Sequence, residues 1–317
     1  MSTARAYPNI ALIKYWGKAD EELMLPAAGS LSLTLDTFAT TTTVTLVPEA
    51  DDDSLELNGA EATPEQVRRV TRLLDIVREW SGSTAHARVV TRNEAPTGAG
   101  LASSASGFAA LATAAADAYG LDLSARDLSR LARRGSGSAT RSIFPGLAMW
   151  HAGDDESSCA EDVSGPDFRM IIVFVDESHK SVTSREAMRR TAATSPFHSA
   201  WVESTAQSLD LALQACADDD FTRLGQLTES NALRMHAVIQ SAEPPIRYLT
   251  ARSIAVFDAV ERLREDGLEA YATADAGPNV VVISRPADAD AVAERLGDLG
   301  RVAVVGPGPG AALISEE

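Results

Sequence analysis

The stretch that decides the fold is NEAPTGAGLASSASG, residues 93–107. It follows a short apolar segment, residues 87–91, and passes directly into an alanine-rich run that ends near Tyr119. This order predicts a strand, a glycine loop and a helix. Glycines let the backbone approach a ligand closely, and the N-terminus of a helix favours negative charge. The stretch therefore predicts a phosphate-binding site.

Two alternatives for the same stretch stay open. It is not a Walker A loop, because no Lys-Ser or Lys-Thr pair follows the second glycine, and Ser103 stands where a dinucleotide-binding GxGxxG motif has its third glycine. The dinucleotide motif also requires a later acidic residue at a strand end, whereas Asp117 and Asp122 fall around the end of the predicted helix. A purely structural glycine turn is the other alternative. The hydroxyl side chains beside the glycines favour a polar ligand.

A second unusual segment is PNIALIKYWGK, residues 8–18. Only three of the 28 basic residues in the chain are lysines, and this segment holds two of them, Lys14 and Lys18. A compact ammonium on a flexible stem suits contact with phosphate oxygens, and solvated lysines at a strand end are the alternative. For the third lysine, Lys180, we expect a solvated strand end.

Composition limits the class of protein. With 317 residues and 45% hydrophobic content, the chain is long enough for about two domains with a full core. Its formal net charge of -17 argues against nucleic-acid binding, so an anionic ligand needs a local basic pocket. Acidic runs such as residues 51–53 and 218–220 indicate solvated surface, and a salty cytoplasm is an alternative reason for them.

Targeting and redox signals are absent from the sequence. It contains no apolar run near the ~20 residues of a membrane span and no apolar secretion signal, so we expect a cytoplasmic protein. Cys159 and Cys216 lie far apart without further metal-ligating residues nearby, which indicates neither a disulfide framework nor a zinc site.

Hydrophobic periodicity predicts further elements. Thr63 is the expected N-cap of a helix that has Pro64 at its first position and stops at Gly82. His236 falls on a predicted helix with no second metal ligand nearby, so we expect a structural role for it. The predicted strands are residues 40–47, 87–91, 169–175, 269–273, 280–284 and 301–305, and the other predicted helices are residues 201–216, 221–239, 248–264 and 287–296.

Four segments together resemble the diphosphomevalonate decarboxylase family of the GHMP kinase superfamily. They are NIALIKYWGK at residues 9–18, the glycine loop at 96–107, RRGSGSATRS at 133–142 and DAGPN at 275–279. Shorter similarities lie between and after them in the same order. These are LP at 25–26, SLSLTL at 30–35, TSR at 183–185, TSP at 194–196, PPI at 244–246 and PGPG at 307–310.

The resemblance implies an α+β fold with two lobes. The expected N-terminal lobe, residues 1–180, contains a left-handed βαβ phosphate-binding unit. The expected C-terminal lobe, residues 181–317, is ferredoxin-like and carries Asp275. Family members are commonly homodimers, so a homodimer is expected, although the sequence does not locate the interface.

The resemblance also implies a reaction. The enzyme would use ATP and Mg²⁺ to phosphorylate the tertiary hydroxyl of (R)-5-diphosphomevalonate and would then release phosphate and carbon dioxide to give isopentenyl diphosphate, in the mevalonate pathway of isoprenoid biosynthesis. Asp275 matches the catalytic aspartate, and Arg141, with Asn9 as its supporting partner, matches the arginine that holds the substrate carboxylate. Lys18 is also expected to approach the transferring phosphate. Without the resemblance, DAGPN is good turn chemistry and Arg141 is a helix-face residue.

The remaining implied site residues fall into two groups. The substrate would be bound by Tyr15, Lys18, Ser136, Gly137, Ser138, Arg141, Ser184 and Arg185. ATP would be bound by Pro96, Gly98, Gly100, Leu101, Ala102, Ser103, Ser104 and Ser106, with Ser103 or Ser104 contacting Mg²⁺.

Departures from the family pattern and rival functions keep some points open. Residues 27–29 and 185–187 differ from the commonest family pattern, which leaves fine substrate contacts undecided. The enzymatic alternatives are a phosphomevalonate decarboxylase and a GHMP small-molecule kinase that stops after phosphorylation. A noncatalytic phosphate-ligand sensor and a dinucleotide oxidoreductase are alternatives from other classes. Arg141 with Asn9 favours decarboxylation, and Lys18 with Arg185 favours a diphosphate.

Overall fold

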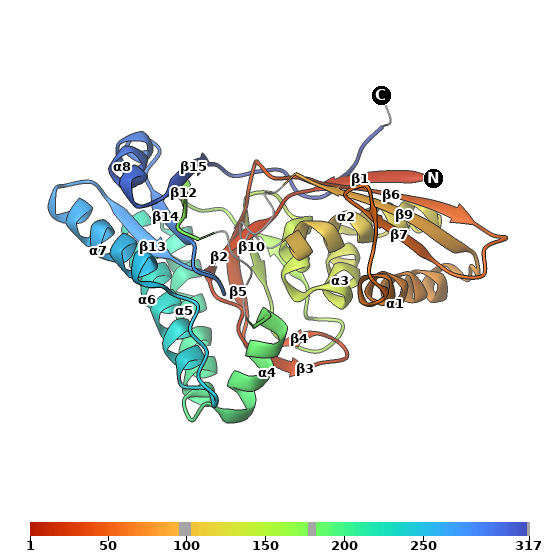
Figure 1. Cartoon of the computed structure of the whole chain (residues 1–317), viewed down its shortest axis with the longest axis horizontal. Helices are drawn as coiled ribbons and strands as arrows, with labels where there is room; N and C mark the ends of the chain where they lie inside the picture. The colour runs from red at the N-terminus through yellow and green to blue at the C-terminus, as the bar shows by residue number, and fades with distance from the viewer. Residues whose placement is uncertain (95–102, 177–181, 316–317) are drawn as a thin grey trace.

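The computed structural model describes residues 1–94, 103–176 and 182–315, and for Ser103 the backbone alone. Within these ranges the strands form three sheets and a small hairpin. Figure 1 shows one lobe built from the first part of the chain, a second lobe built mainly from the last part, and a middle sheet between them. The predicted two-lobed α+β architecture is confirmed.

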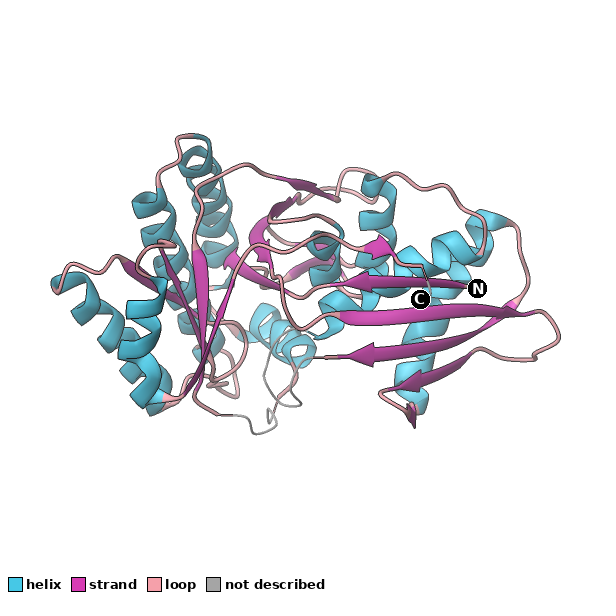
Figure 2. Ribbon diagram, turned by 90° about the horizontal axis from the view of Figure 1, so that it is seen from above, coloured by secondary structure: helices cyan, strands magenta, loops and turns pink. Residues whose placement is uncertain are grey.

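The N-terminal lobe is a sheet with helices packed on one face. Figure 2 shows its long strands side by side. The strand order is β16 (Ala312–Leu313), β1 (Ser2–Ala6), β6 (Thr40–Val47), β9 (His86–Asn93), β7 (Ser54–Leu57) and β8 (Ala60–Glu61), and the helices are α1 (Pro64–Ser81), α2 (Ser103–Ala118) and α3 (Ala125–Gly135). Because β16 pairs with β1, the end of the chain returns to the lobe in which it begins.

Local chemistry sets the limits of α1 as predicted. The Thr63 side chain accepts a hydrogen bond from the Gln66 N–H, and the Gln66 side chain accepts one from the Thr63 N–H, which is a capping box. Pro64 occupies the first turn, where its missing N–H costs nothing. Gly82 ends the helix with a φ of 68°, a left-handed conformation that glycine adopts without strain.

The middle sheet has the strand order β11 (Ala160–Asp162), β10 (Leu147–Trp150), β5 (Ser30–Thr34) and β2 (Asn9–Ile13). Every residue of β2 and β5 is buried, so neither strand shows the alternation that marks a half-exposed strand. Next to this sheet lie the hairpin of β3 (Lys18–Asp20) and β4 (Leu25–Pro26) and the 3₁₀ helix η1 (Gly137–Ile143).

The C-terminal lobe has the predicted ferredoxin-like topology. Its antiparallel sheet has the order β13 (Ala270–Thr273), β14 (Val280–Ser284), β12 (Arg169–Phe174) and β15 (Arg301–Val305). Helices between β12 and β13 and between β14 and β15 complete a β-α-β-β-α-β sequence. They are α4 (Ser184–Thr194), α5 (His198–Ala217), α6 (Phe221–Gln240), α7 (Ala251–Glu265) and α8 (Ala289–Leu296), the last followed by the 3₁₀ helix η2 (Gly297–Leu299).

Strand β12 connects the two lobes through its alternating side chains. Met170 and Ile172 belong to a hydrophobic core that also contains side chains of α5, α6 and the middle sheet. Ile171 and Val173 belong to a separate core with α7 and α8. The predicted division of the chain at residue 180 falls outside the described residues and stays a prediction.

None of the helices in the described ranges has the length and apolarity required to cross a membrane.

Candidate functional site

The middle sheet and the C-terminal lobe meet at an ion pair between the buried Lys14 and the partly exposed Asp275. Lys14 follows β2 in the middle sheet, and Asp275 lies in the turn between β13 and β14. The Lys14 Nζ is 2.6 Å from the Asp275 Oδ1 and also donates to the Ala11 carbonyl at 2.7 Å. The Lys14 side chain is 1% exposed and that of Asp275 is 33% exposed. The ammonium therefore fixes a carboxylate that solvent and substrate can still reach.

Neighbouring groups hold both partners of this pair. Burial lowers the pKa of Lys14, and the adjacent Asp275 carboxylate opposes that shift by favouring the charged ammonium. The Lys14 backbone N–H donates to the Asn231 side chain on α6 at 2.8 Å. On the other side, the Gly277 N–H donates to the Asp275 carbonyl at 2.7 Å, which closes the turn. For Lys14 the sequence suggested phosphate contact or a solvated strand end, and the second interpretation is wrong because the side chain is buried.

Arg141 is a buried cation surrounded by neutral partners. Its guanidinium donates to the Ser32 hydroxyl at 2.8 Å, to the Ser30 hydroxyl, and to the Asn9 side-chain oxygen at 3.2 Å. Within the described ranges no carboxylate lies within 4.0 Å of it. Burial lowers the pKa of Arg141 to about 10, so the side chain remains charged at neutral pH. A buried cation without an anionic partner is a suitable site for a substrate carboxylate.

Asn9 also links strand β2 to the 3₁₀ helix η1. Its amide nitrogen donates to the Ser138 carbonyl at 2.9 Å and to the Ser142 hydroxyl at 2.8 Å. One side chain thus ties β2 to η1 while its oxygen accepts from Arg141. The geometry brings Asn9 and Arg141 together, as their assigned roles require.

A group of hydroxyls lies around the start of η1. The Ser136 hydroxyl is 3.4 Å from that of Ser104, at the start of α2, and 3.3 Å from that of Ser138. Tyr15 is close by, and its buried hydroxyl has no hydrogen-bond partner in the described structure. Burial raises the pKa of Tyr15, which keeps the phenol protonated as a donor. Ser104, one of the predicted ATP residues, therefore lies beside the predicted substrate residues Tyr15, Ser136 and Ser138.

Gly137 occupies a position where a side chain does not fit. A Cβ there would lie 2.8 Å from the Trp150 ring and 2.9 Å from the Tyr15 hydroxyl oxygen. Because glycine has no side chain, the backbone of this turn can lie close to the Tyr15 hydroxyl and the Trp150 ring.

Basic side chains from two parts of the chain converge beside these hydroxyls. Lys18 on β3 lies 2.8 Å from Glu21, and the same Glu21 oxygen is 3.3 Å from Arg189 on α4. Burial lowers the pKa of Lys18, Glu21 raises it, and the Arg185 and Arg189 guanidiniums lower it again. This is the local basic region that an acidic chain needs for a phosphate ligand, and the sequence did not indicate Glu21 or Arg189.

Helix α4 presents Ser184 and Arg185 from its first turn. Thr183 is the N-cap and accepts a hydrogen bond from the Glu186 N–H. Burial lowers the pKa of Arg69 on α1, and the Arg185 charge lowers it further. The Arg185 side chain therefore extends from α4 toward the N-terminal lobe. Arg185 also lies close to Lys18, whose pKa its charge lowers.

Part of the predicted ATP site lies outside the described residues, namely Pro96, Gly98, Gly100, Leu101 and Ala102. Ser104 is exposed at the start of α2, and the first turn of this helix contains no acidic residue. Ser106 is 1% exposed and its hydroxyl is 2.7 Å from that of Thr40, so it contributes to packing beneath the helix start. The assigned ATP contacts stay predictions.

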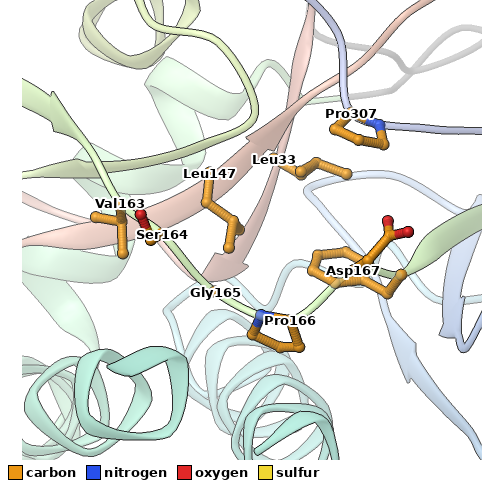
Figure 3. Close-up of a pocket in the computed structure, with 9 residues that line it drawn as sticks. Leu33, Leu147, Val163, Ser164, Gly165, Pro166, Asp167 and Pro307 are labelled. Atoms are coloured by element: carbon orange, nitrogen blue, oxygen red, sulfur yellow. The ribbon is translucent and has the colours of Figure 1, made fainter. Parts of the chain in front are cut away.

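A pocket of about 320 Å³ lies elsewhere, on the segment that joins β11 to β12. Figure 3 shows the residues that line this pocket, and none of them is a predicted site residue. The lining consists of Leu33, Leu147, Val163, Ser164, Gly165, Pro166, Asp167, Phe168 and Pro307. The described residues also contain no group of three or more His, Cys, Asp or Glu that could hold a metal ion.

Comparison with known proteins identifies the family. The model of the diphosphomevalonate decarboxylase-like N-terminal domain matches residues 6–161, and that of the mevalonate 5-diphosphate decarboxylase C-terminal domain matches residues 170–302. The chain belongs to the diphosphomevalonate decarboxylase family. The resemblance of the sequence motifs is thereby confirmed over most of the chain.

Three relatives illustrate how close this decarboxylase family match is. The Homo sapiens diphosphomevalonate decarboxylase is 38% identical over 308 residues, which cover 89% of this chain and 76% of the human one. The Staphylococcus aureus mevalonate diphosphate decarboxylase structure has a TM-score of 0.95 and 40% identity, covering 99% of this chain and 98% of that one. The structure named MDDEF in complex with MVAPP, AMPPCP and magnesium has a TM-score of 0.94 and 43% identity, covering 99% of both chains.

His236 packs behind the ion pair and has the structural role that we expected. It lies on α6, is 2% exposed, and its Nε2 is 3.2 Å from the Ala274 carbonyl oxygen. Burial lowers its pKa to about 4, so in the folded decarboxylase the imidazole is neutral at pH 7.

We predict that acid destabilises the protein through His236. Since the folded-state pKa is below the unfolded value of 6.5, the unfolded state binds the proton first, and stability falls as the pH drops from about 6.5 to about 4. Between pH 7 and pH 5 this one group accounts for about 2 kcal/mol. Urea denaturation at both pH values should show a smaller loss for His236→Gln than for the wild type. An equal loss in both proteins would contradict the prediction.

Proposed function

We propose that this chain catalyses the ATP-dependent decarboxylation of (R)-5-diphosphomevalonate to isopentenyl diphosphate, carbon dioxide, ADP and phosphate. The observation that carries the proposal is that the Lys14–Asp275 pair lies close enough to Arg141 for their charges to interact, while the direct partners of Arg141 are all neutral. A kinase that stops after phosphorylation needs only the Lys14–Asp275 pair. Arg141 is suited to a substrate that also presents a carboxylate.

Asp275 acts on the tertiary hydroxyl. Its carboxylate is fixed by the Lys14 ammonium and is 33% exposed, so it can accept a hydrogen bond from the hydroxyl and orient that oxygen toward the transferring phosphate. Lys14 also offsets the negative charge that the oxygen gains as its proton is lost. Together they address the poor nucleophilicity of a tertiary alcohol.

Arg141 acts in the second half of the reaction. When phosphate leaves, positive charge develops at the tertiary carbon, and the neighbouring carboxylate must be aligned for loss of carbon dioxide. The planar guanidinium binds a carboxylate through two N–H donors, and Asn9, Ser30 and Ser32 fix its orientation. A fixed Arg141 would thus hold the substrate carboxylate in the orientation that the loss of carbon dioxide requires.

The diphosphate group would be held by the basic region and the hydroxyls. Lys18 and Arg185 supply charge, and Tyr15, Ser136 and Ser138 supply hydroxyl donors. Two cations with several donors suit a diphosphate better than a monophosphate, which supports diphosphomevalonate over the alternative, phosphomevalonate. A noncatalytic sensor would not require the buried Lys14–Asp275 pair.

ATP would bind along the start of α2, with its phosphates at the helix N-terminus. The exposed Ser104 and the absence of acidic residues in the first turn fit a polyphosphate. Magnesium, when bound, neutralises phosphate charge, and the hydroxyl of Ser103 or Ser104 would contact it. The lack of a three-carboxylate cluster among the described residues fits an ion held chiefly by the phosphates.

We also propose a homodimer in the cytoplasm. Leu211 on α5 and Leu233 on α6 are 46% and 45% exposed, and these helices pack against each other, which supports an apolar contact with a second copy. The buried thiols of Cys159 and Cys216 are both free, which fits a reducing compartment. Sedimentation velocity should give twice the chain mass of 33.5 kDa, and a mass of one chain would exclude the dimer.

The activity is tested by a paired assay with ATP and magnesium. ADP and carbon dioxide should form in equal amounts from diphosphomevalonate, and phosphomevalonate should not be turned over. Asp275→Ala should abolish both products because the hydroxyl loses its orienting carboxylate. ADP without carbon dioxide would indicate a kinase, turnover of phosphomevalonate would indicate the rival decarboxylase, and no turnover of either substrate would refute the proposal.

The two lysines of residues 8–18 should have separable effects. Lys14→Met removes the partner of Asp275 and should lower kcat by about 100-fold or more with a small change in the KM for diphosphomevalonate. Lys18→Met should instead raise that KM by about 10-fold, since Lys18 acts through charge on the diphosphate. Steady-state kinetics separate the two, and identical changes in both variants would rule out this division of roles.

A further inference from the structure

A cluster of aromatic side chains lies behind the site and joins three of its segments. The cluster consists of Trp16, Trp201 and Tyr248, which share one hydrophobic core and are 4%, 4% and 8% exposed. The Trp16 and Tyr248 rings pack edge to face at 6.4 Å, and the Trp201 indole N–H donates to the Trp16 carbonyl at 2.8 Å. We refer to these three residues as the aromatic cluster.

Each site segment contributes a neighbour to the aromatic cluster. Trp16 itself stands between Tyr15 and Lys18 in the sequence. Ala276, in the same core, follows Asp275, and Ala187, also there, lies two positions after Arg185 on α4. A displacement of this core therefore moves side chains that the reaction needs, although no member of the aromatic cluster is assigned to contact substrate.

Tyr248 makes the most specific of these connections. Its hydroxyl donates to the Val182 carbonyl at 3.1 Å. Val182 directly precedes Thr183, the N-cap of α4, and packs against the same core as Ala187 on the next turn of the helix. This contact resembles a hydrophobic staple, which sets the angle at which a chain enters a helix. Because Ser184 and Arg185 form the first turn, that angle determines where they point.

We propose that Tyr248 is a positioning residue for the diphosphate of the substrate, acting through Ser184 and Arg185 at the start of α4. The inference rests on the proposed function, because it assigns a residue to the diphosphate subsite of the same reaction. Burial raises the pKa of Tyr248 to about 12, so its hydroxyl is a permanent donor at neutral pH. The side chain thus works as a fixed support and takes no part in proton transfer.

Tyr248→Phe removes only the hydroxyl. Loss of one hydrogen bond of about 1 kcal/mol corresponds to a factor of about 5. The KM for diphosphomevalonate should rise about fivefold, while kcat stays within twofold, because Lys14, Asp275 and Arg141 are held by other contacts. A KM within twofold of the wild type, or a loss confined to kcat, would overturn the proposal.

Tyr119→Phe is the matched control. Tyr119 is also 8% exposed, and its hydroxyl likewise donates to a backbone carbonyl, that of Ala85, at 2.7 Å. It follows α2 at the end opposite Ser104, roughly 20 Å away at the rise of a helix. A similar loss of stability without a change in KM is expected. A KM increase as large as that of Tyr248→Phe would mean a general effect of lost stability and would overturn the proposal.

A double-mutant cycle tests the route through α4. In an Arg185→Gln background, adding Tyr248→Phe should raise KM by less than twofold, because the charged side chain that it positions is already gone and only Ser184 is left. A full fivefold increase in that background would show that Tyr248 acts elsewhere and would refute the route.

The outcome can be separated from that of the proposed function. Turnover by the wild type tests the function first. If the wild type turned over no substrate, the Kd for inorganic pyrophosphate, measured by calorimetry, would still test Tyr248. A fivefold weaker Kd in Tyr248→Phe would support its positioning role at an anion site, and an unchanged Kd would overturn it.

Discussion

The site depends on a lysine that is almost completely removed from water. Lys14 is 1% exposed, and a charged ammonium in such a place is stable only with a fixed partner, which Asp275 supplies at 2.6 Å. The pair joins the middle sheet to the C-terminal lobe, so the position of the Asp275 carboxylate, the proposed catalytic group, is set by how these two parts dock. The continuous core that contains β2, β5, β12 and α6 makes that docking rigid.

An acidic chain that binds two polyphosphates must separate its surface charge from its site charge. Much of the acidic surplus is exposed, as at residues 218–220, although Asp53 in the run at residues 51–53 is buried and paired with Arg78 at 3.0 Å. Lys18, Arg185 and Arg189 gather instead near the junction of the lobes. Glu21 pairs with both Lys18 and Arg189, which limits repulsion between cations that are only partly hydrated. The charges that would meet a phosphate are thus held together before it arrives.

The sequence predicted those elements whose local signals agree with the fold. Thr63, Pro64 and Gly82 defined α1 to the residue, and alternation defined β6 as Thr40–Val47. The wholly buried β2 and β5 lack such alternation, and periodicity did not reveal them. For α7, the predicted start at residue 248 was too early: Thr250 is the N-cap, so the helix begins at Ala251, and Tyr248 belongs to the preceding segment.

The site residues that the sequence predicted lie in local motifs, and the ones it missed act through long-range contacts. Asp275, Arg141 and Asn9 stand in motifs, and the structure brings Arg141 together with Asn9 and places Asp275 beside Lys14. Lys14 also stands in a motif, at residues 9–18, but its partnership with Asp275 was not predicted because the two residues are 261 positions apart in the chain. Glu21, Arg189 and Tyr248 carry no motif that indicates their contacts. Such pairings arise from tertiary structure and cannot be read from local sequence.

Several polar groups near the site remain without the partners that buried groups normally have. The Tyr15 hydroxyl and the Trp16 indole nitrogen are buried and unpaired in the described structure, and Arg141 has only neutral partners. Each arrangement reduces folding stability, since a buried polar group without a full partner has lost its hydration. In the proposed site a bound anion would restore partners to Arg141 and Tyr15, so part of the binding free energy would come from groups that folding left unsatisfied. Until then the Trp150 ring supports both side chains, because its centroid lies 4.8 Å from that of the Tyr15 ring and 5.9 Å from the Arg141 guanidinium carbon.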